Sequence, residues 1–237
     1  PGEWVALAPH DALPQPGALA EMLAAAARQE AETGGRVGLV SADVGDGHVP
    51  VVDPYFGGMT VAAPAGTGWL DADYPHGTLL LARRGCLEEI GLFDERYFAY
   101  CEEADLGIRA RAAGWQVGLV RGARVVNPTQ RSDPPVTDYL MHRNTLLLVR
   151  HHSGRYHAFI RFCLAVIQLI QGLVRPASRP WVFSARGRVW GLIDFLRGRF
   201  GPPPAFLHGP DLRAAAGGRP QTWRAAKVSQ SSGSPLA

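Results

Sequence analysis

Three carboxylates fall within four positions of the stretch FAYCEEADLGIRARAAGW (residues 98–115). Glu102, Glu103 and Asp105 stand where a run of helix-forming residues begins. Acidic side chains stabilise the first turn of a helix, because its unpaired N–H groups carry partial positive charge. Asp105 also precedes Arg109 by four residues, the favourable order for an ion pair along a helix. Helix formation alone therefore explains part of the cluster.

Helix formation accounts for one or two of these acids more readily than for all of them. Neighbouring like charges repel, and the repulsion raises the pKa of at least one carboxyl group. Such a cluster is typical of a site that abstracts a proton or binds a positive group. The acidic cluster is therefore a candidate catalytic site, with a solvated helix end as the alternative interpretation.

Strands and helices alternate around this cluster. Apolar runs and helix-forming runs predict strands at 3–8, 36–44, 77–84, 115–120 and 123–126 and helices at 18–32 and 85–91. Segment 53–75 is rich in Gly, Pro and Asp and is predicted to be irregular. The alternation predicts an α/β fold with a mostly parallel sheet flanked by helices, and a site at the carboxyl ends of the strands.

Charge is distributed unevenly along the chain. Residues 1–140 contain 10 Lys and Arg against 19 Asp and Glu, whereas residues 141–237 contain 14 against 2. The basic residues of the second part are interleaved with long apolar runs. This pattern favours an anionic membrane surface over nucleic acid as the partner. The cysteines, Cys86, Cys101 and Cys163, form no CxxC pair, which favours reduced thiols in the cytosol over a structural zinc site.

The second part of the chain predicts helices at 137–154, 156–175 and 186–201. The uncharged run from Phe162 to Val174 has 13 residues, whereas a bilayer span needs about 20. An amphipathic appendage lying in the membrane interface is therefore expected, and packing of these helices on the core is the alternative. The Ala-, Gly-, Ser- and Pro-rich end of the chain predicts a disordered tail.

Residues 77–126, GTLLLARRGCLEEIGLFDERYFAYCEEADLGIRARAAGWQVGLVRGARVV, resemble the C-terminal half of the catalytic domain of family 2 inverting glycosyltransferases. The likeness is to rhamnosyltransferase-like and galactofuranosyltransferase-like members. In that family a strand with Gly and paired Arg precedes GxFDExFF, an EDxDL helix start, RxxxxG and a further strand. The resemblance implies a partial GT-A (Rossmann-like) catalytic domain over 1–136, a basic helical region over 137–205 and a disordered tail over 206–237.

The resemblance also implies roles for individual residues. Glu103 stands where the family has its Asp general base, with Glu102 and Asp105 as the other acids of the catalytic cluster. His76, Gly77 and Arg109 are expected to bind the substrate. A sugar hydroxyl is a poor nucleophile, so displacement at an anomeric carbon requires a carboxylate to accept its proton.

A second stretch, ALAPHDALPQPGAL (6–19), resembles the acidic metal-binding segment of the family. It places Asp11 on the last acid of the motif, after Pro9 and His10, and Asn127 stands where the family commonly has His. The resemblance implies a divalent metal, Mg²⁺ or Mn²⁺, at Asp11 and Asn127, with His10 or water completing the shell. Such an ion would neutralise charge on the leaving nucleoside diphosphate.

Family members begin with a strand–turn–helix unit that binds the nucleotide base, whereas this sequence opens just before the metal-binding segment. We therefore expect a fragment of a longer enzyme, with an uncovered sheet edge and little activity alone. The implied function is sugar transfer from a nucleotide-diphosphate sugar to a glycan or lipid-linked acceptor in cell-envelope polysaccharide synthesis. The implied location is cytoplasmic, peripheral at the inner face of the plasma membrane.

Two other function classes remain open. One is a non-catalytic, membrane-associated remnant of such an enzyme, which would have little reason to keep a repelling acidic cluster. The other is a metal-dependent hydrolase using the same acids. The sequence has no GxSxG and no His-rich metal spacing to support it.

Overall fold

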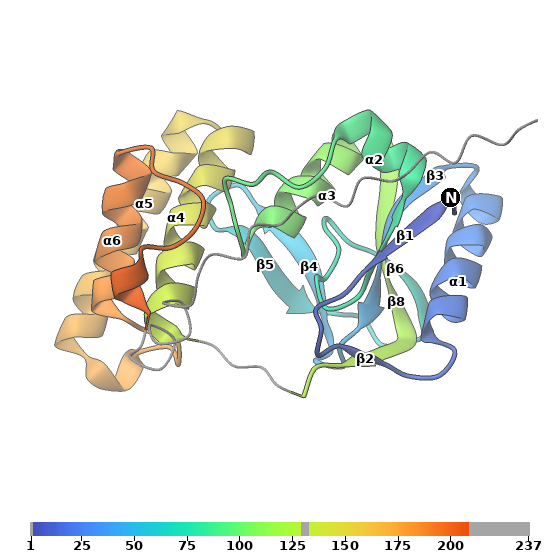
Figure 1. Cartoon of the computed structure of the whole chain (residues 1–237), viewed down its shortest axis with the longest axis horizontal. Helices are drawn as coiled ribbons and strands as arrows, with labels where there is room; N and C mark the ends of the chain where they lie inside the picture. The colour runs from blue at the N-terminus through green and yellow to red at the C-terminus, as the bar shows by residue number, and fades with distance from the viewer. Residues whose placement is uncertain (1, 129–132, 209–237) are drawn as a thin grey trace, which may run out of the picture.

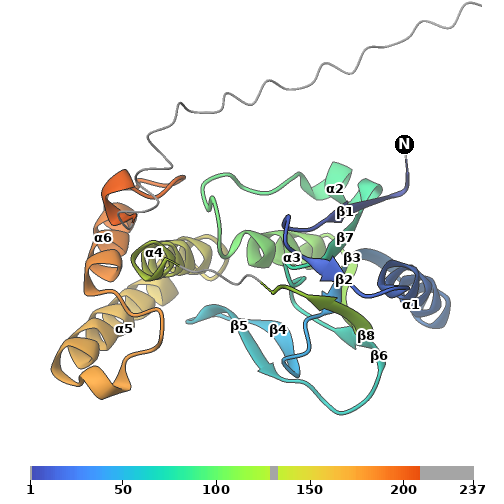
Figure 2. The same cartoon turned by 60° about the horizontal axis from the view of Figure 1, so that its bottom comes forward.

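A computed structural model describes residues 2–128 and 133–208 of the chain. An α/β part built on a curled sheet lies beside a group of helices, α4, α5 and α6, which follows it in the sequence (Figure 1). The same two parts are distinct after rotation of the view, with α4 nearest to the α/β part (Figure 2).

The main sheet has the strand order β1–β7–β3–β8–β2, with β6 also paired to β8. The strands are β1 (Trp4–Leu7), β2 (Leu13–Pro14), β3 (Arg36–Asp43), β6 (Gly68–Asp71), β7 (Leu80–Arg83) and β8 (Trp115–Val126). The α/β class is confirmed, but the sheet is mixed: β3 and β8 pair in parallel, and every other pairing in this sheet is antiparallel. Central strands that are covered on both faces are apolar whether they run parallel or antiparallel. The composition of the strands therefore did not reveal the antiparallel pairings.

Helices cover both faces of this sheet. Helix α1 (Ala18–Thr33) packs on one face, where Met22 belongs to the same buried cluster as Val40 and Val120. Helices α2 (Arg84–Ile90) and α3 (Glu102–Ala112) pack on the other, where Leu106 contributes to a second buried cluster. This second cluster fixes the position of α3, the helix that begins with the acidic residues.

The prediction that 53–75 is irregular was wrong. The structure has a hairpin of β4 (His48–Asp53) and β5 (Gly57–Ala62), followed by β6. The Asp53 carboxylate accepts hydrogen bonds from the N–H groups of Tyr55 and Phe56, at 2.7 and 2.8 Å, and Gly57 has a φ of 74°. The turn-forming residues therefore build a tight hairpin turn. The strands predicted at 115–120 and 123–126 are likewise one strand, β8.

The segment from 72 to 79 joins β6 to β7 without a helix. These two strands lie on opposite sides of the β8–β3 pair, so the connection crosses one end of the sheet. Helix α3 lies against this connection, because a Cβ added to Gly107 would collide with the backbone of Asp73 and Tyr74. The crossing segment and the start of α3 thus meet at one end of the sheet.

The helical part consists of α4 (Pro134–His152), α5 (Arg155–Val174) and α6 (Ala185–Leu196), with short 3₁₀ turns at Pro176–Ser178 and Ala205–Leu207. Helix α4 begins three residues before its predicted start, with proline in its first turn, where the missing N–H costs nothing. Helix α6 packs closely on α4 through Gly187 and Gly191. Of the predicted tail, Leu207 is buried against Tyr139, and residues 209–237 lie outside the described residues.

Candidate active site

A cavity of about 1040 Å³ lies at the end of the sheet where the crossing segment meets α3. Its lining comes from the end of β1, from residues 74–78, from the loop ahead of α3, and from Asn127 after β8. Glu102 and Glu103 line it together with Asp94 and Glu95, and no Lys or Arg of the described residues does. The cavity is therefore acidic, and its exposed rings, Phe98 and Tyr100, offer apolar surface beside the carboxyl groups.

Glu102 and Glu103 form a coupled pair of carboxyl groups. Burial, followed by the charge of Glu103, raises the pKa of Glu102 to about 8. Burial also raises the pKa of Glu103, while the hydrogen bond between the two side chains favours ionised Glu103 and protonated Glu102. The pair thus retains one proton near neutral pH, with Glu103 as a carboxylate of increased basicity. This is the state that a general base requires.

The crossing segment is shaped to admit Glu103. A Cβ added to Gly77 would collide with the Oε1 atom of Glu103, so a larger residue here would displace this carboxylate from its present position. Beside it, the Nδ1 atom of His76 accepts a hydrogen bond from the Thr78 N–H at 3.3 Å, and burial lowers the pKa of His76. A neutral imidazole therefore lies near the acidic pair. The Tyr74 hydroxyl donates to the Met59 carbonyl at 3.1 Å, which anchors this segment to β5.

The loop ahead of α3 has an unusual backbone. Phe98, Tyr100 and Cys101 have φ values of 66°, 67° and 73°. Residues other than glycine rarely adopt this left-handed conformation, and each costs about 1–3 kcal/mol unless its surroundings enforce it. Cys101 is the N-cap of α3, so the unusual backbone ends directly at Glu102. The direction in which the acidic pair points therefore depends on what holds this loop.

Helix α4 holds the loop through two buried polar residues. The Asn144 side-chain N–H₂ group donates to the carbonyls of Tyr97, Ala99 and Tyr100 at 2.8, 2.7 and 2.9 Å. Arg143 donates to the Tyr97 carbonyl at 3.2 Å and orients Asn144 by donating to its Oδ1 atom at 3.0 Å. Both side chains are fully buried. Hydrogen bonds from helix α4 thus hold the strained loop in its left-handed backbone conformation.

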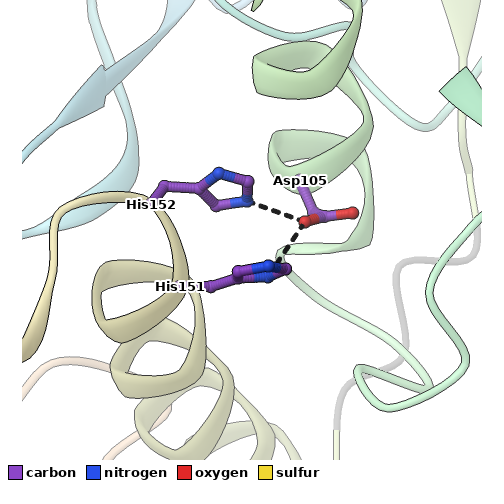
Figure 3. A group of neighbouring side chains, drawn as sticks. All are labelled: Asp105, His151 and His152. Carbon is purple, nitrogen blue, oxygen red and sulfur yellow. Dashed lines mark hydrogen bonds and ion pairs between the residues drawn. The ribbon is translucent and has the colours of Figure 1, made fainter.

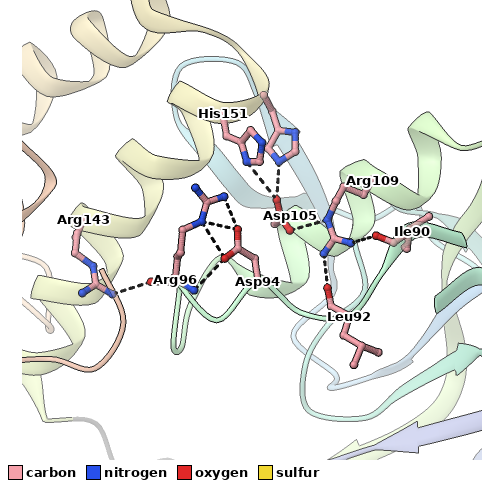
Figure 4. A network of polar contacts seen from close by, with 9 residues as sticks. Ile90, Leu92, Asp94, Arg96, Asp105, Arg109, Arg143 and His151 are labelled. Atoms are coloured by element: carbon pink, nitrogen blue, oxygen red, sulfur yellow. Dashed lines mark hydrogen bonds and ion pairs between the residues drawn. The ribbon is translucent and has the colours of Figure 1, made fainter. Parts of the chain in front are cut away.

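Asp105 faces away from the cavity, into a network that joins α3 to its neighbours. Its carboxylate accepts hydrogen bonds from Arg109 Nε at 2.8 Å and from His152 Nε2 at 2.7 Å, with His151 Nδ1 at 3.9 Å (Figure 3). Burial would raise the pKa of Asp105, but these hydrogen bonds outweigh it and the pKa is lowered. Arg109 also donates to the carbonyls of Ile90 and Leu92, at 2.6 and 2.9 Å (Figure 4).

Asp105, His151 and His152 are also a candidate metal-ligating group, with ligand atoms within 4.8 Å of one another. The Arg109 guanidinium already occupies one oxygen of Asp105, and its charge would repel a divalent cation. We therefore assign the group to the hydrogen-bond network that fastens the end of α4 to the first turn of α3. The two histidines are not among the residues singled out from the sequence, and nothing in the sequence indicates this contact.

The structure brings together only some of the residues singled out from the sequence. Glu102, Glu103, His76, Gly77 and Asn127 line one cavity. The others, Asp11, Asp105 and Arg109, do not line it, and neither does His10.

The pairing of Leu13 with Val126 nevertheless brings the segment of Asp11 beside that of Asn127. Sequence reasoning missed Arg143 and Asn144. Their only sequence signal is two polar residues next to an apolar helical run.

We expect Asn144→Ala to release the loop and to lower the free energy of unfolding by about 2–4 kcal/mol, since buried carbonyls lose their donors. Amide exchange at Asp105, whose N–H donates to Cys101, should accelerate more than exchange in α1. Gln116→Ala is the matched control, because its amide donates to Thr33 at the surface. Unchanged exchange at Asp105 would show that the loop holds its shape without Asn144.

The raised pKa of Glu102 predicts a pH dependence of stability. A carboxyl group with a raised folded pKa stabilises most below its unfolded pKa, and this stabilisation is lost as pH rises through the folded pKa. Between about pH 4.5 and 8, Glu102 should therefore lower the free energy of unfolding by about 1.4 kcal/mol for each unit by which the pH rises. Glu102→Gln removes this ionisation. The free energy of unfolding of the variant should therefore rise relative to that of the wild type as pH increases. Urea unfolding at several pH values measures the difference, and parallel curves would contradict the raised pKa.

The amino-acid sequence was compared with protein families and with curated proteins. The model of the family described as "Glycosyltransferase like family 2" matches residues 2–147, more than half of the chain. The N-acetylglucosaminyl-diphospho-decaprenol L-rhamnosyltransferases of Mycobacterium tuberculosis strains CDC 1551 / Oshkosh and ATCC 25618 / H37Rv are each 39% identical to it over 101 residues. The match covers 41% of this chain and 31% of each relative, so the chain spans about a third of their length. The chain belongs to glycosyltransferase family 2.

Proposed function

We propose that this chain contributes the acceptor side and the general base of an inverting glycosyltransferase, which moves a sugar from a nucleoside diphosphate sugar to a glycan or lipid-linked acceptor. The observation that carries the proposal is the half-buried Glu102–Glu103 pair at the wall of a cavity, where the pKa of both carboxyl groups is raised by burial. The membership of the chain in glycosyltransferase family 2 supports the reaction class. The matched relatives act, by name, on N-acetylglucosaminyl-diphospho-decaprenol, which supports a lipid-linked acceptor in cell-envelope polysaccharide synthesis.

The lining of the cavity suits a neutral sugar. Carboxylates accept hydrogen bonds from sugar hydroxyls, and the rings of Phe98 and Tyr100 offer flat apolar surface. An acidic cavity with no lining Lys or Arg disfavours an anionic diphosphate by itself. The cavity is therefore proposed to hold the acceptor sugar, with one hydroxyl directed at Glu103.

In the proposed reaction Glu103 accepts the proton of that hydroxyl as its oxygen attacks the anomeric carbon of the donor. The nucleoside diphosphate leaves from the opposite face, and the anomeric configuration inverts. Protonated Glu102 donates to Glu103 and keeps the shared charge localised on it. Gly77 leaves the space in which Glu103 reaches the cavity.

A divalent metal, Mg²⁺ or Mn²⁺, belongs to the proposal. Asp11 and Asn127 are the residues that would hold it, since strand pairing brings their segments together at the edge of the cavity. One carboxylate and one amide oxygen are a small set, which suits an ion whose other ligands are water and substrate phosphates. When bound, such an ion supplies positive charge for the leaving diphosphate.

In an enzyme that also includes the nucleotide-binding unit expected from the sequence, Glu103→Gln should lower turnover by at least about 10²-fold, because it removes the proton acceptor without changing the shape of the side chain. Donor binding should change little. Turnover is measured as sugar transfer from a panel of nucleoside diphosphate sugars to a polyprenyl-diphosphate-linked sugar. Donor binding is measured by calorimetric titration with the same nucleoside diphosphate sugars. Glu88→Gln, an exposed acid on α2, is the control. Turnover that survives Gln at 103 but not Asp would assign the base to another group.

We also propose that α5 lies on the anionic inner surface of the plasma membrane, which makes the protein cytoplasmic and peripheral. Its length and composition would allow it to cross a membrane, and 22% of its most apolar window is buried. Exposed apolar residues repeat along one stripe of the helix: Tyr156, Phe159, Ile167, Ile170 and Val174. No acidic residue occurs between 139 and 193, whereas arginine recurs throughout. An apolar stripe flanked by arginine fits a surface of anionic lipids.

Ile170→Glu should weaken binding to vesicles containing phosphatidylglycerol by at least about tenfold, since it places a charge in the apolar stripe. Leu92→Glu, at an exposed position remote from α5, should leave binding unchanged. Co-sedimentation at rising salt measures both. Equal binding of the wild type to neutral and anionic vesicles at high salt would favour insertion over surface docking.

A further inference from the structure

A second cavity, of about 380 Å³, lies among α4, α5 and the segment leading into α6. It shares no lining residue with the acidic cavity. Asp138, His142, Arg161 and Arg188 form its buried floor, and Gln171 is among the exposed residues at its rim. Polar groups thus gather at the bottom of a hollow in the helical bundle.

Arg161 carries a buried charge without a carboxylate partner among the described residues. It is 8% exposed, its Nε atom has no hydrogen-bond partner, and its Nη1 atom reaches Gln168 Oε1 at 3.4 Å. Burial, and then the charge of Arg188, lowers the pKa of Arg161. The Arg161 guanidinium lies 5.9 Å from the centroid of the Phe56 ring, but no carboxylate of the described residues neutralises it, and buried cations are normally paired with one.

The nearby acid, Asp138, is already saturated. Its oxygens accept from Arg188 Nη2 at 3.0 Å, from His142 Nδ1 at 3.0 Å and from the Ser184 N–H at 2.8 Å. Burial would raise the pKa of Asp138, but these bonds outweigh it and the pKa is lowered. One carboxylate therefore balances one of two buried guanidinium groups, and the floor keeps a net positive charge.

A second nitrogen on the floor lacks a partner. The Nε2 atom of His142 is buried without a hydrogen bond, while Nδ1 is engaged by Asp138. When the ring is protonated, Nε2 becomes a donor on the same cavity as Arg161 Nε. Two buried nitrogens on different helices, α4 and α5, are thus left for a group that the chain does not provide.

We propose that this cavity binds a phosphoryl anion, held by Arg161 and His142. A guanidinium presents several N–H donors in a fixed plane that matches phosphate oxygens, and such charge-assisted bonds are the strong ones. The side-chain amides of Gln168 and Gln171 line the same cavity and can donate as well. No Phe, Tyr or Trp of the described chain lines it, so the phosphoryl group is recognised and not a nucleobase.

Phosphate binding can be tested by thermal unfolding of the whole chain in phosphate and in chloride at equal ionic strength. Phosphate at about five times its Kd should raise the Tm by about 2–4 °C. Arg161→Met should abolish this increment and should raise the Tm in chloride, because it removes an unpaired buried charge. Calorimetric titration with inorganic phosphate should show at least tenfold weaker binding to this variant.

The matched control is Arg175→Met, which removes an exposed arginine from the end of the same helix and should keep the phosphate increment. Gln171→Glu places a carboxylate at the exposed rim and should lose the increment without disturbing the fold, so the test does not depend on Arg161→Met being stable. No increment in the wild type, or an increment that persists in both cavity variants, would overturn the proposal.

The source of the phosphoryl group is a lipid headgroup or free phosphate. Leu173 and Trp181, each adjacent in sequence to a lining residue, are exposed apolar side chains. A short-chain phosphatidic acid, below its micelle concentration, should bind more tightly than inorganic phosphate if these side chains receive an acyl chain. Equal affinity would assign the cavity to free phosphate. Both results depend on Arg161, and neither depends on sugar transfer.

Discussion

The left-handed backbone at Phe98, Tyr100 and Cys101 is the constraint on which the site depends. It turns the chain so that Glu102 and Glu103 begin α3 at the wall of the cavity, and it persists because Asn144 binds three of the loop's carbonyls. Each left-handed residue costs about 1–3 kcal/mol, which a few buried hydrogen bonds to the loop can offset. The geometry of the acidic pair in the α/β part therefore depends on a helix that the domain prediction had placed in another region.

The other contacts that position the site are made by the same short helix, α3. Leu106 anchors α3 in the core, Gly107 lets it approach the crossing segment, and Asp105 fastens it to His152 of α4. With α3 held on these sides, Glu103 has one open direction, over Gly77 into the cavity. Partial burial of the carboxyl pair raises the pKa of both groups, because these surroundings do not solvate two charges as water does.

The sequence predicted the α/β class, the boundaries of most helices to within a few residues, and the acidic cluster at the start of α3. Helical geometry also separates Glu103 from Asp105, which lie about 200° apart around the helix axis. It therefore explains why one faces the cavity and the other the network. The direction of β7 was not predictable, since a strand buried on both faces has the same composition either way. The contact between Asn144 and the loop joins segments more than 40 residues apart, and no local pattern encodes it.

The central claim is that Glu102 and Glu103 share one proton, with the charge on Glu103. An NMR titration of the chain labelled with ¹³C at the glutamate side-chain carboxyl carbon observes each carboxyl group directly. The account predicts that Glu102 titrates near pH 8, and that the resonance of Glu103 shifts in the same step because the two groups are coupled. Titration of both residues near pH 4.5, alongside the exposed glutamates, would contradict it.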